Sequence, residues 1–158
     1  MNYIIREMKE CEYPLLNEFL YEALFVPEGA EMPAKSVLDA PELQVYIEGF
    51  GTKKDDCCIV AQADNKTLIG AAWVRIMNDY GHIDDETPSL AISLYKHHRG
   101  LGIGTAMLNQ LFSLLKMNGY KKTSLSVQKE NYAAELYKKL GYEIVAEHEQ
   151  DYLMVKNL

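Results

Sequence analysis

Three glycines spaced two residues apart follow an arginine near the middle of the chain. The segment reads Arg99-Gly100-Leu101-Gly102-Ile103-Gly104 and opens an apolar pattern typical of a helix. Glycines let the backbone approach a ligand closely, and the unpaired N–H groups of a first helical turn favour an anion by about 0.3–1 kcal/mol. Arg99 adds a fixed positive charge with forked donors. The segment therefore suits a pyrophosphate, although tight packing at a strand-to-helix turn also selects glycines.

Two other phosphate-binding motifs fail on residue identity. A P-loop requires lysine after the last glycine, but Thr105 and Ala106 follow Gly104. A dinucleotide fingerprint requires a small residue at Thr105 or Met107. It also requires an acidic residue about 20 positions later, where the chain reads Lys121-Lys122-Thr123-Ser124. Neither nucleotide motif is therefore predicted, and ATP or NAD at this loop is the weakest alternative.

A second motif lies downstream, in Asn131-Tyr132-Ala133-Ala134-Glu135-Leu136-Tyr137-Lys138-Lys139-Leu140-Gly141-Tyr142. It resembles the N-x-x-A-x-x-L-Y-x-x-x-G-F/Y motif of the GNAT acetyltransferase superfamily. The segment from Leu94 to Thr105 resembles the central motif of the same family, Gln/Arg-x-x-Gly-x-Gly/Ala. The two motifs in this order are more specific than either alone. The resemblance covers about Cys57 to Val155, and the first third of the chain matches only in its order of elements.

The resemblance implies a site for acetyl-CoA. Backbone groups of Ile92 and Leu94 would bind the pantetheine arm, which extends the sheet like an added strand. The pyrophosphate loop would comprise Arg99, Gly100, Leu101, Gly102, Ile103, Gly104 and Thr105. Asn131 matches an asparagine that contacts the arm near the thioester, and it also suits a helix N-cap. No metal is expected, because the adjacent His97 and His98 lack further ligands at suitable spacing.

Acyl transfer to an amine needs a proton donor for the leaving thiolate and a base for the amine. Tyr137 matches the family's general acid, and a phenol with a pKa of about 10 is protonated at neutral pH. Tyr137 also lies on an apolar helical face, where core packing is the alternative role. For the base, the acids Asp84, Asp85 and Glu86 precede a strand, and Glu86 is preferred over the alternative of a solvated loop.

The base cannot be assigned from the resemblance. Many relatives carry Pro-Glu-Leu where this chain reads Pro88-Ser89-Leu90. The sequence does not assign the residues of the acceptor site either. Trp73 and Arg75 alternate on one strand, and they either line the acceptor site or pack in the sheet. Glu28 and Glu31 could meet a cation or only water.

The elements expected to position these residues alternate in type along the chain. We expect an α/β (α+β) fold of GNAT type, with a mixed, largely antiparallel sheet of about six to seven strands and helices on both faces. The order is β-α-α-β-β-β-α-β-α-β-β. Strands are expected at residues 2–6, 57–63, 68–77, 89–95, 123–127, 142–146 and 152–155. Helices are expected from Pro14, from Pro41, after the glycine segment to Gly119, and over 131–140.

Length and composition limit the remaining classes of protein. A chain of 158 residues without repeats or linker-like stretches predicts one domain over residues 1–158. Net charge is -7, with no basic stripe, which argues against nucleic acid. No apolar run approaches the roughly 20 residues of a membrane span, and the N-terminus does not resemble a signal peptide. With only three cysteines, a cytoplasmic location fits best.

These observations predict an acetyl-CoA-dependent N-acetyltransferase that acts directly on the primary amine of a small molecule or peptide. No cysteine is placed by a motif for a covalent intermediate, so no ping-pong step is expected. A homodimer is possible. The alternative is a non-catalytic module that senses or presents acyl-CoA, which would need the glycine loop but not Tyr137.

Overall fold

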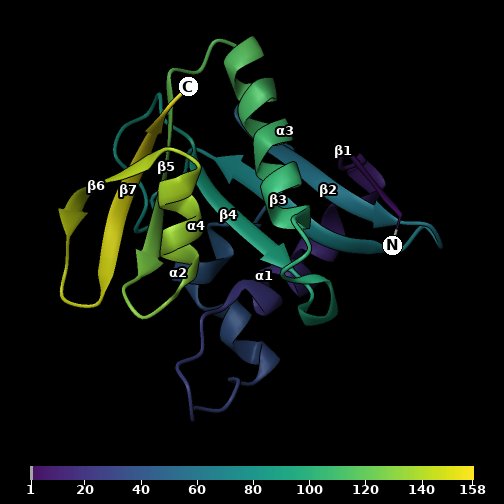
Figure 1. Ribbon diagram of the computed structural model, residues 1–158, viewed down its shortest axis with the longest axis horizontal. Helices are drawn as coiled ribbons and strands as arrows, with labels where there is room; N and C mark the ends of the chain where they lie inside the picture. The colour runs from purple at the N-terminus through teal and green to yellow at the C-terminus, as the bar shows by residue number, and fades with distance from the viewer. Residues whose placement is uncertain (1) are drawn as a thin grey trace.

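A single seven-stranded sheet organises the computed structural model, which describes residues 2–158 (Figure 1). The strand order is β1-β2-β3-β4-β5-β7-β6, and every neighbouring pair is antiparallel except β4 and β5. The strands are β1 (Tyr3–Glu7), β2 (Cys57–Ala63), β3 (Leu68–Arg75), β4 (Ser89–Leu94), β5 (Lys122–Gln128), β6 (Tyr142–Glu147) and β7 (Asp151–Asn157). The helices are α1 (Leu16–Ala23), α2 (Pro41–Gln44), α3 (Ile103–Met117) and α4 (Ala133–Lys139). The expected mixed sheet is confirmed.

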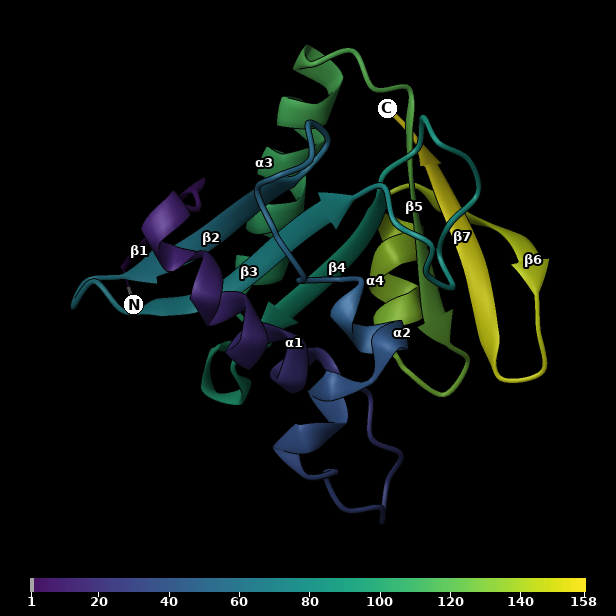
Figure 2. The ribbon, with the colours of Figure 1, turned by 180° about the vertical axis from the view of Figure 1, so that it is seen from behind.

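Helices cover both faces of this sheet because alternate residues of the inner strands are apolar on both sides. One face, here called the α3 face, packs β2, β3 and β4 against α3 and continues under α4 through Leu125 and Val127 of β5. The other, the α1 face, packs Val60, Ala71 and Trp73 against α1 and the segment that follows α2. Figure 2 shows α1 lying in front of β3 and β4 on this side, with α2 beside it, while β6 and β7 have no helix in front of them.

The parallel pair at the centre of the sheet is short. β4 and β5 share one register pair, Ser89 with Ser124, supported by a 3.1 Å hydrogen bond from the Ser124 N–H to the Pro88 carbonyl. Beyond this pair the two strands are not hydrogen-bonded to each other, although each continues to pair fully with its other neighbour. From this pair toward Leu94, β4 and β5 therefore separate and leave a gap in the sheet.

Three short 3-10 helices join the longer elements, at η1 (Glu10–Leu15), η2 (Lys35–Asp39) and η3 (Lys96–His98). None was expected from the sequence pattern, because three to six residues are too few to show a helical period. The second helix starts at Pro41 as predicted but ends at Gln44, and turns carry the chain on to Phe50. The predicted strand to Met77 is too long, since β3 ends at Arg75.

Long α3 ends as its glycine predicts. Gly119 has φ +89°, and the Tyr120 N–H bonds back to the Leu115 carbonyl at 3.1 Å, a helix-terminating pattern that needs a left-handed residue. Among residues 2–158, no helix has both the length and the apolar character that a bilayer crossing requires.

Candidate active site

The glycine segment forms the turn between β4 and α3. Gly100 and Gly102 have φ values of +76° and +83°, a conformation that side chains with a Cβ adopt at a cost. A Cβ built on either glycine would find no heavy atom within 4 Å, so the backbone there faces open space. The first helical bond of α3 runs from the Ala106 N–H to the Gly102 carbonyl. The N–H groups of residues 103–105 therefore have no acceptor within the helix, as an anion site requires.

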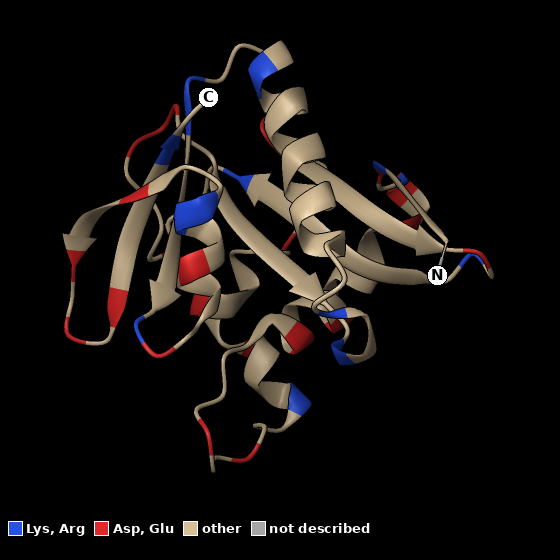
Figure 3. Cartoon of the chain, in the orientation of Figure 1, with Lys and Arg blue, Asp and Glu red and all other residues tan. Residues whose placement is uncertain are grey.

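Arg99 connects this turn to two neighbouring elements. Its Nε donates to the Leu94 carbonyl at 2.8 Å, and Nη2 lies 3.3 Å from a carboxylate oxygen of Glu22 on α1. The side chain is 41% exposed, and the N–H groups of the guanidinium that remain unbonded can reach a ligand. Figure 3 shows basic residues in the loop between β4 and α3, next to acidic residues on α1. Arg99 therefore positions the turn against α1 and adds positive charge at its edge.

The backbone of β4 presents hydrogen-bonding groups to the gap between β4 and β5. The Tyr95 N–H bonds to the Ile69 carbonyl on β3, and residues of an antiparallel ladder alternate in direction. Odd-numbered residues of β4 thus bond to β3, whereas Ile92 and Leu94 point their N–H and C=O groups toward β5. Since β5 pairs with β4 only at Ser124, these groups lie beside the gap. An extended amide-containing chain could bond to them as an added strand would.

Asn131 acts as a helix cap. Its Oδ1 accepts a 2.9 Å hydrogen bond from the Ala133 N–H, at the start of α4. Asn131 lies in the loop that joins the C-terminal end of β5, at Gln128, to α4, and it is half-buried there. The capping role is observed, and the contact with a cofactor arm stays a prediction.

Tyr137 lies on the buried side of α4, within the core cluster that includes Leu125 and Val127 of β5. Its side chain is 9% exposed, and its ring meets that of Tyr142 edge-to-face, with centroids 5.8 Å apart. Burial raises the pKa of Tyr137 to about 12. The phenol is therefore protonated at any pH at which the protein would be assayed. Its ring contributes to the core, and this location is compatible with a proton-donating hydroxyl.

Glu86 lies apart from the residues named above. It is exposed in the turn before β4, where its N–H bonds to Asp84 Oδ1 at 2.9 Å. Because β4 runs away from this turn, Glu86 is at the opposite end of the strand from Leu94 and the glycine turn. A different acid of the same loop, Asp79, packs against the junction of β4 and β5: Ser89 Oγ donates to its Oδ1 at 2.9 Å. No motif or spacing in the sequence distinguishes Asp79 from the other acids of this loop.

Trp73 and Arg75 contribute to the fold rather than to an open acceptor pocket. Both are almost completely buried, and Trp73 Nε1 donates to the Tyr46 carbonyl at 3.0 Å. Arg75 pairs with Asp56 at 3.0 Å and donates to the Val45 and Glu48 carbonyls at 3.2 and 2.8 Å. Together they anchor the segment 45–48 to β3. Across residues 2–158, no three His, Cys, Asp or Glu side chains gather as metal ligands would.

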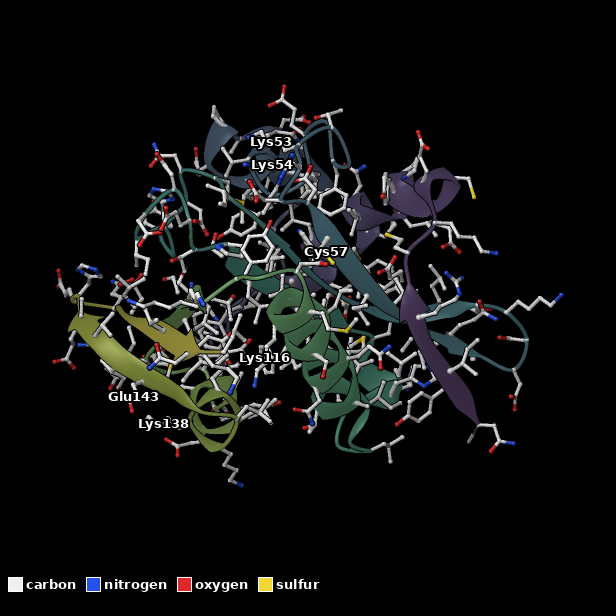
Figure 4. All side chains as sticks on the ribbon, turned by 90° about the horizontal axis from the view of Figure 1, so that it is seen from above. Lys53, Lys54, Cys57, Lys116, Lys138 and Glu143 are labelled. Carbon is white, nitrogen blue, oxygen red and sulfur yellow. The ribbon has the colours of Figure 1, made fainter. Side chains whose placement is uncertain are left out.

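The cysteines lie away from the glycine turn. Cys57 begins β2 near the C-terminal part of α3 (Figure 4) and lines a cavity of about 190 Å³ together with Lys54 and Tyr120. Burial raises the pKa of Cys57 to about 11 and that of Cys58 well above its usual value. Both are therefore protonated thiols, which are poor nucleophiles. Cys11 is exposed on the 3-10 segment after β1.

Comparison with known sequences decides the family. The sequence model of the Acetyltransferase (GNAT) family matches residues 17–142. The chain belongs to the GNAT family. It is therefore an acetyltransferase, and the glycine turn and α4 motif resembling that family both fall within the matched residues, the latter ending at Tyr142.

Two proteins of Bacillus subtilis are similar to this chain. This GNAT protein is 34% identical over 86 residues to the uncharacterized N-acetyltransferase YobR of Bacillus subtilis (strain 168), covering 54% of this chain and 32% of YobR. The chain thus spans about a third of that relative. It is 26% identical to the uncharacterized protein YyaT of the same strain over 125 residues, which are 79% of this chain and 76% of YyaT.

The fold also matches a solved structure along its whole length. The crystal structure of PaiA N-acetyltransferase from Thermoplasma acidophilum, in complex with coenzyme A, superposes with a TM-score of 0.73. The match covers 100% of both chains at 20% sequence identity. At this identity the similarity establishes the fold alone.

Proposed function

We propose that this acetyltransferase uses acetyl-CoA as donor and transfers the acetyl group directly to a primary amine. The observation that carries the proposal is the divided sheet: β4 and β5 separate after Ser89 and Ser124, and the gap leads to the glycine turn. Main-chain groups of Ile92 and Leu94 line one side of the gap. Residues 103–105 present free N–H groups at its end. This arrangement fits a long amide-containing arm that ends in a pyrophosphate.

Open space beside the glycine turn supports the choice of donor. The open space beside Gly100 and Gly102 would receive the phosphates, with Arg99 beside them. Acetyl-CoA supplies an activated acyl group on a good leaving group, and the chain supplies orientation and proton transfer. Tyr137, protonated and almost buried, would donate to the sulfur as the C–S bond breaks. Asn131, at the start of α4, would contact the arm near the thioester.

Direct transfer fits the state of the thiols. The two cysteines of β2 are protonated, and neither lies on β4, β5, α4 or the glycine turn. A covalent acyl-cysteine would need a thiolate beside the thioester carbonyl. The amine would therefore attack the thioester itself, in a ternary complex of protein, donor and acceptor.

An acceptor screen tests the proposal. The protein is incubated with acetyl-CoA and a panel of spermidine, an aminoglycoside, amino acid esters and short peptides, and the release of coenzyme A is measured. We expect release above the hydrolysis background with at least one primary amine, and none with the same compound after all its amines have been acetylated. Tight binding of acetyl-CoA without release for any amine would contradict the proposed reaction and favour an acyl-CoA-binding module.

A further inference from the structure

The loop between β3 and β4 is fastened to the sheet where β4 and β5 begin to separate. Ser89 and Ser124 form the only register pair between these strands, and paired residues of neighbouring strands point to the same face. Ser89 Oγ donates to Asp79 Oδ1 at 2.9 Å, and Ser124 Oγ donates to the Gly81 carbonyl at 2.6 Å. Both serine hydroxyls therefore hold the loop, from the α1 face, over the end of the gap.

Gly81 places the carboxyl group of Asp79 near β5 as well as β4. A Cβ at Gly81 would lie 3.2 Å from Asp79 Oδ2 and 3.2 Å from backbone atoms of Leu125. Leu125 is the first residue of β5 beyond the pair with Ser89. The absence of a side chain at Gly81 thus lets the loop rest on β5. The carboxyl group is held at the point where the two strands part.

The surroundings of Asp79 favour proton uptake. The group is largely buried but keeps some contact with solvent. Desolvation raises the pKa of Asp79 above its usual value, and hydrogen bonds from Ser89, Tyr46 and the Gly81 N–H oppose this only in part. The titratable groups that face it are therefore Tyr46, from the segment after α2, with Tyr80 and His82 adjacent in its own loop. Burial also raises the pKa of Tyr46, so this phenol carries no negative charge at neutral pH.

The position of Tyr46 is itself fixed by buried contacts. Trp73 donates to the Tyr46 carbonyl, and Arg75 donates to the carbonyls on either side, at Val45 and Glu48. The Tyr46 side chain, which lies close enough to Asp79 to affect its pKa, is therefore attached to β3 through its backbone. Asp79 accepts from the Ser89 hydroxyl and has no ion-pair partner among residues 2–158, whereas Asp85 of the same loop is 94% exposed.

We propose that Asp79 is the general base that takes a proton from the acceptor amine. This inference rests on the proposed N-acetyltransferase function. An amine bound on the α1 face would meet Asp79 at the end of the gap. The phenol of Tyr137 belongs to the α3 face, on the other side of the sheet. The division between β4 and β5 thus separates the proton acceptor from the proton donor.

The step balances without another reactant. The overall change is R–NH₃⁺ + CH₃CO–S–CoA → R–NH–COCH₃ + HS–CoA + H⁺. Asp79 takes one proton from the ammonium group, and the nitrogen lone pair then forms the C–N bond as the C–S bond breaks. The sulfur leaves with the bonding pair and gains a proton, which balances the second proton lost from nitrogen. Asp79 returns its proton to water through its exposed edge.

This role is tested by the pH profile of kcat/KM for Asp79→Asn, measured with the amine of the panel that gives the highest turnover. With a base present, kcat/KM stays level between the pKa of Asp79 and that of the amine, about 10.4 for a lysine-like group. Without the base, only the neutral amine reacts, so kcat/KM of Asp79→Asn should rise about tenfold per pH unit. The deficit against the wild type should thus shrink about 100-fold between pH 7 and pH 9. A merely structural defect would give a deficit independent of pH.

Three further variants separate the possible outcomes. Asp85→Asn, an exposed acid of the same loop, should keep the wild-type profile. Ser89→Ala removes a donor that lowers the pKa of Asp79, so the acid limb should move to higher pH. Glu86→Gln tests the rival base, and the pH-dependent deficit in this variant instead of Asp79→Asn would overturn the proposal. Parallel profiles for Asp79→Asn and the wild type would also overturn it while leaving the acetyltransferase function intact. A wild type inactive with every amine would remove both.

Discussion

Replacing Tyr137 with phenylalanine tests the proton donor with a minimal change in packing. The substitution removes one hydroxyl and keeps the ring, including its edge-to-face contact with Tyr142 at 5.8 Å. A general acid typically contributes 10²–10⁴-fold to a rate, which corresponds to about 2.7–5.5 kcal/mol of transition-state stabilisation. We expect kcat of Tyr137→Phe to fall within that range, with little change in the affinity for coenzyme A.

The shifted pKa of Tyr137 makes the expectation more specific. Its pKa of about 12 is above that of an ordinary thiol, about 8.5, so full transfer to a free thiolate would be uphill by about 5 kcal/mol. Tyr137 would therefore act by a hydrogen bond that strengthens as charge develops on sulfur, with the proton moving during C–S cleavage. It follows that no alkaline limb of kcat below about pH 11 should depend on Tyr137.

The matched control is Tyr142→Phe. Tyr142 is 2% exposed, packs against the same ring, and carries a buried hydroxyl without a hydrogen-bond partner in the described part of the chain. Removing that hydroxyl should leave kcat unchanged and stability equal or slightly higher, because no hydrogen bond is lost. The assay is initial-rate kinetics with acetyl-CoA and one amine from the panel, together with thermal unfolding of each variant. A kcat for Tyr137→Phe within about threefold of the wild type would refute the acid role.

Three other substitutions test the turn, the buried ion pair and the acid sensitivity of the fold. Gly102 has φ +83°, so Gly102→Ala should lower the free energy of unfolding by about 1–2 kcal/mol and weaken the binding of coenzyme A, measured by calorimetry. The control is Gly119→Ala, at φ +89° on the far end of α3, which should lose similar stability but keep the affinity for coenzyme A. Asp56→Asn leaves the fully buried Arg75 without its charge partner, so it should lower the free energy of unfolding in urea by about 3–5 kcal/mol. Adding Arg75→Met should recover part of this loss, and strictly additive effects of the two substitutions would contradict the pairing. Arg6 lowers the pKa of Glu12 to about 2 through a 2.8 Å contact, so this carboxylate stabilises the fold above about pH 4.3 and the effect fades as pH falls toward 2. Glu12→Gln should lower the melting temperature at pH 7 and approach the wild type near pH 2, and a constant difference would argue against the linkage.

Local patterns in the sequence predicted much of the fold. The 3.6-residue period located α1 and α3, runs of β-forming residues joined by Asp64-Asn65-Lys66 located β2 and β3, and Gly119 marked the end of α3. These features could be predicted because helix period, strand composition and left-handed glycine depend on residues close together in the chain. The same locality explains the errors. The turns after Gln44 and the 3-10 segments are too short for a period, and their conformations depend on contacts with distant strands such as those made by Trp73 and Arg75.

For the site, the sequence by itself determined the glycine turn, the α4 motif with Asn131 before the helix and Tyr137 on it, and through them the GNAT resemblance that the family match confirms. Each of these is a contiguous motif whose chemistry is contained in a few neighbouring residues. Only the tertiary structure decided which acid meets the gap. Asp79 and Ser89 are ten residues apart and Ser124 lies far beyond them, yet the short parallel pair of β4 and β5 brings all three to one point. Strand register follows from packing of the whole sheet, which no local pattern encodes.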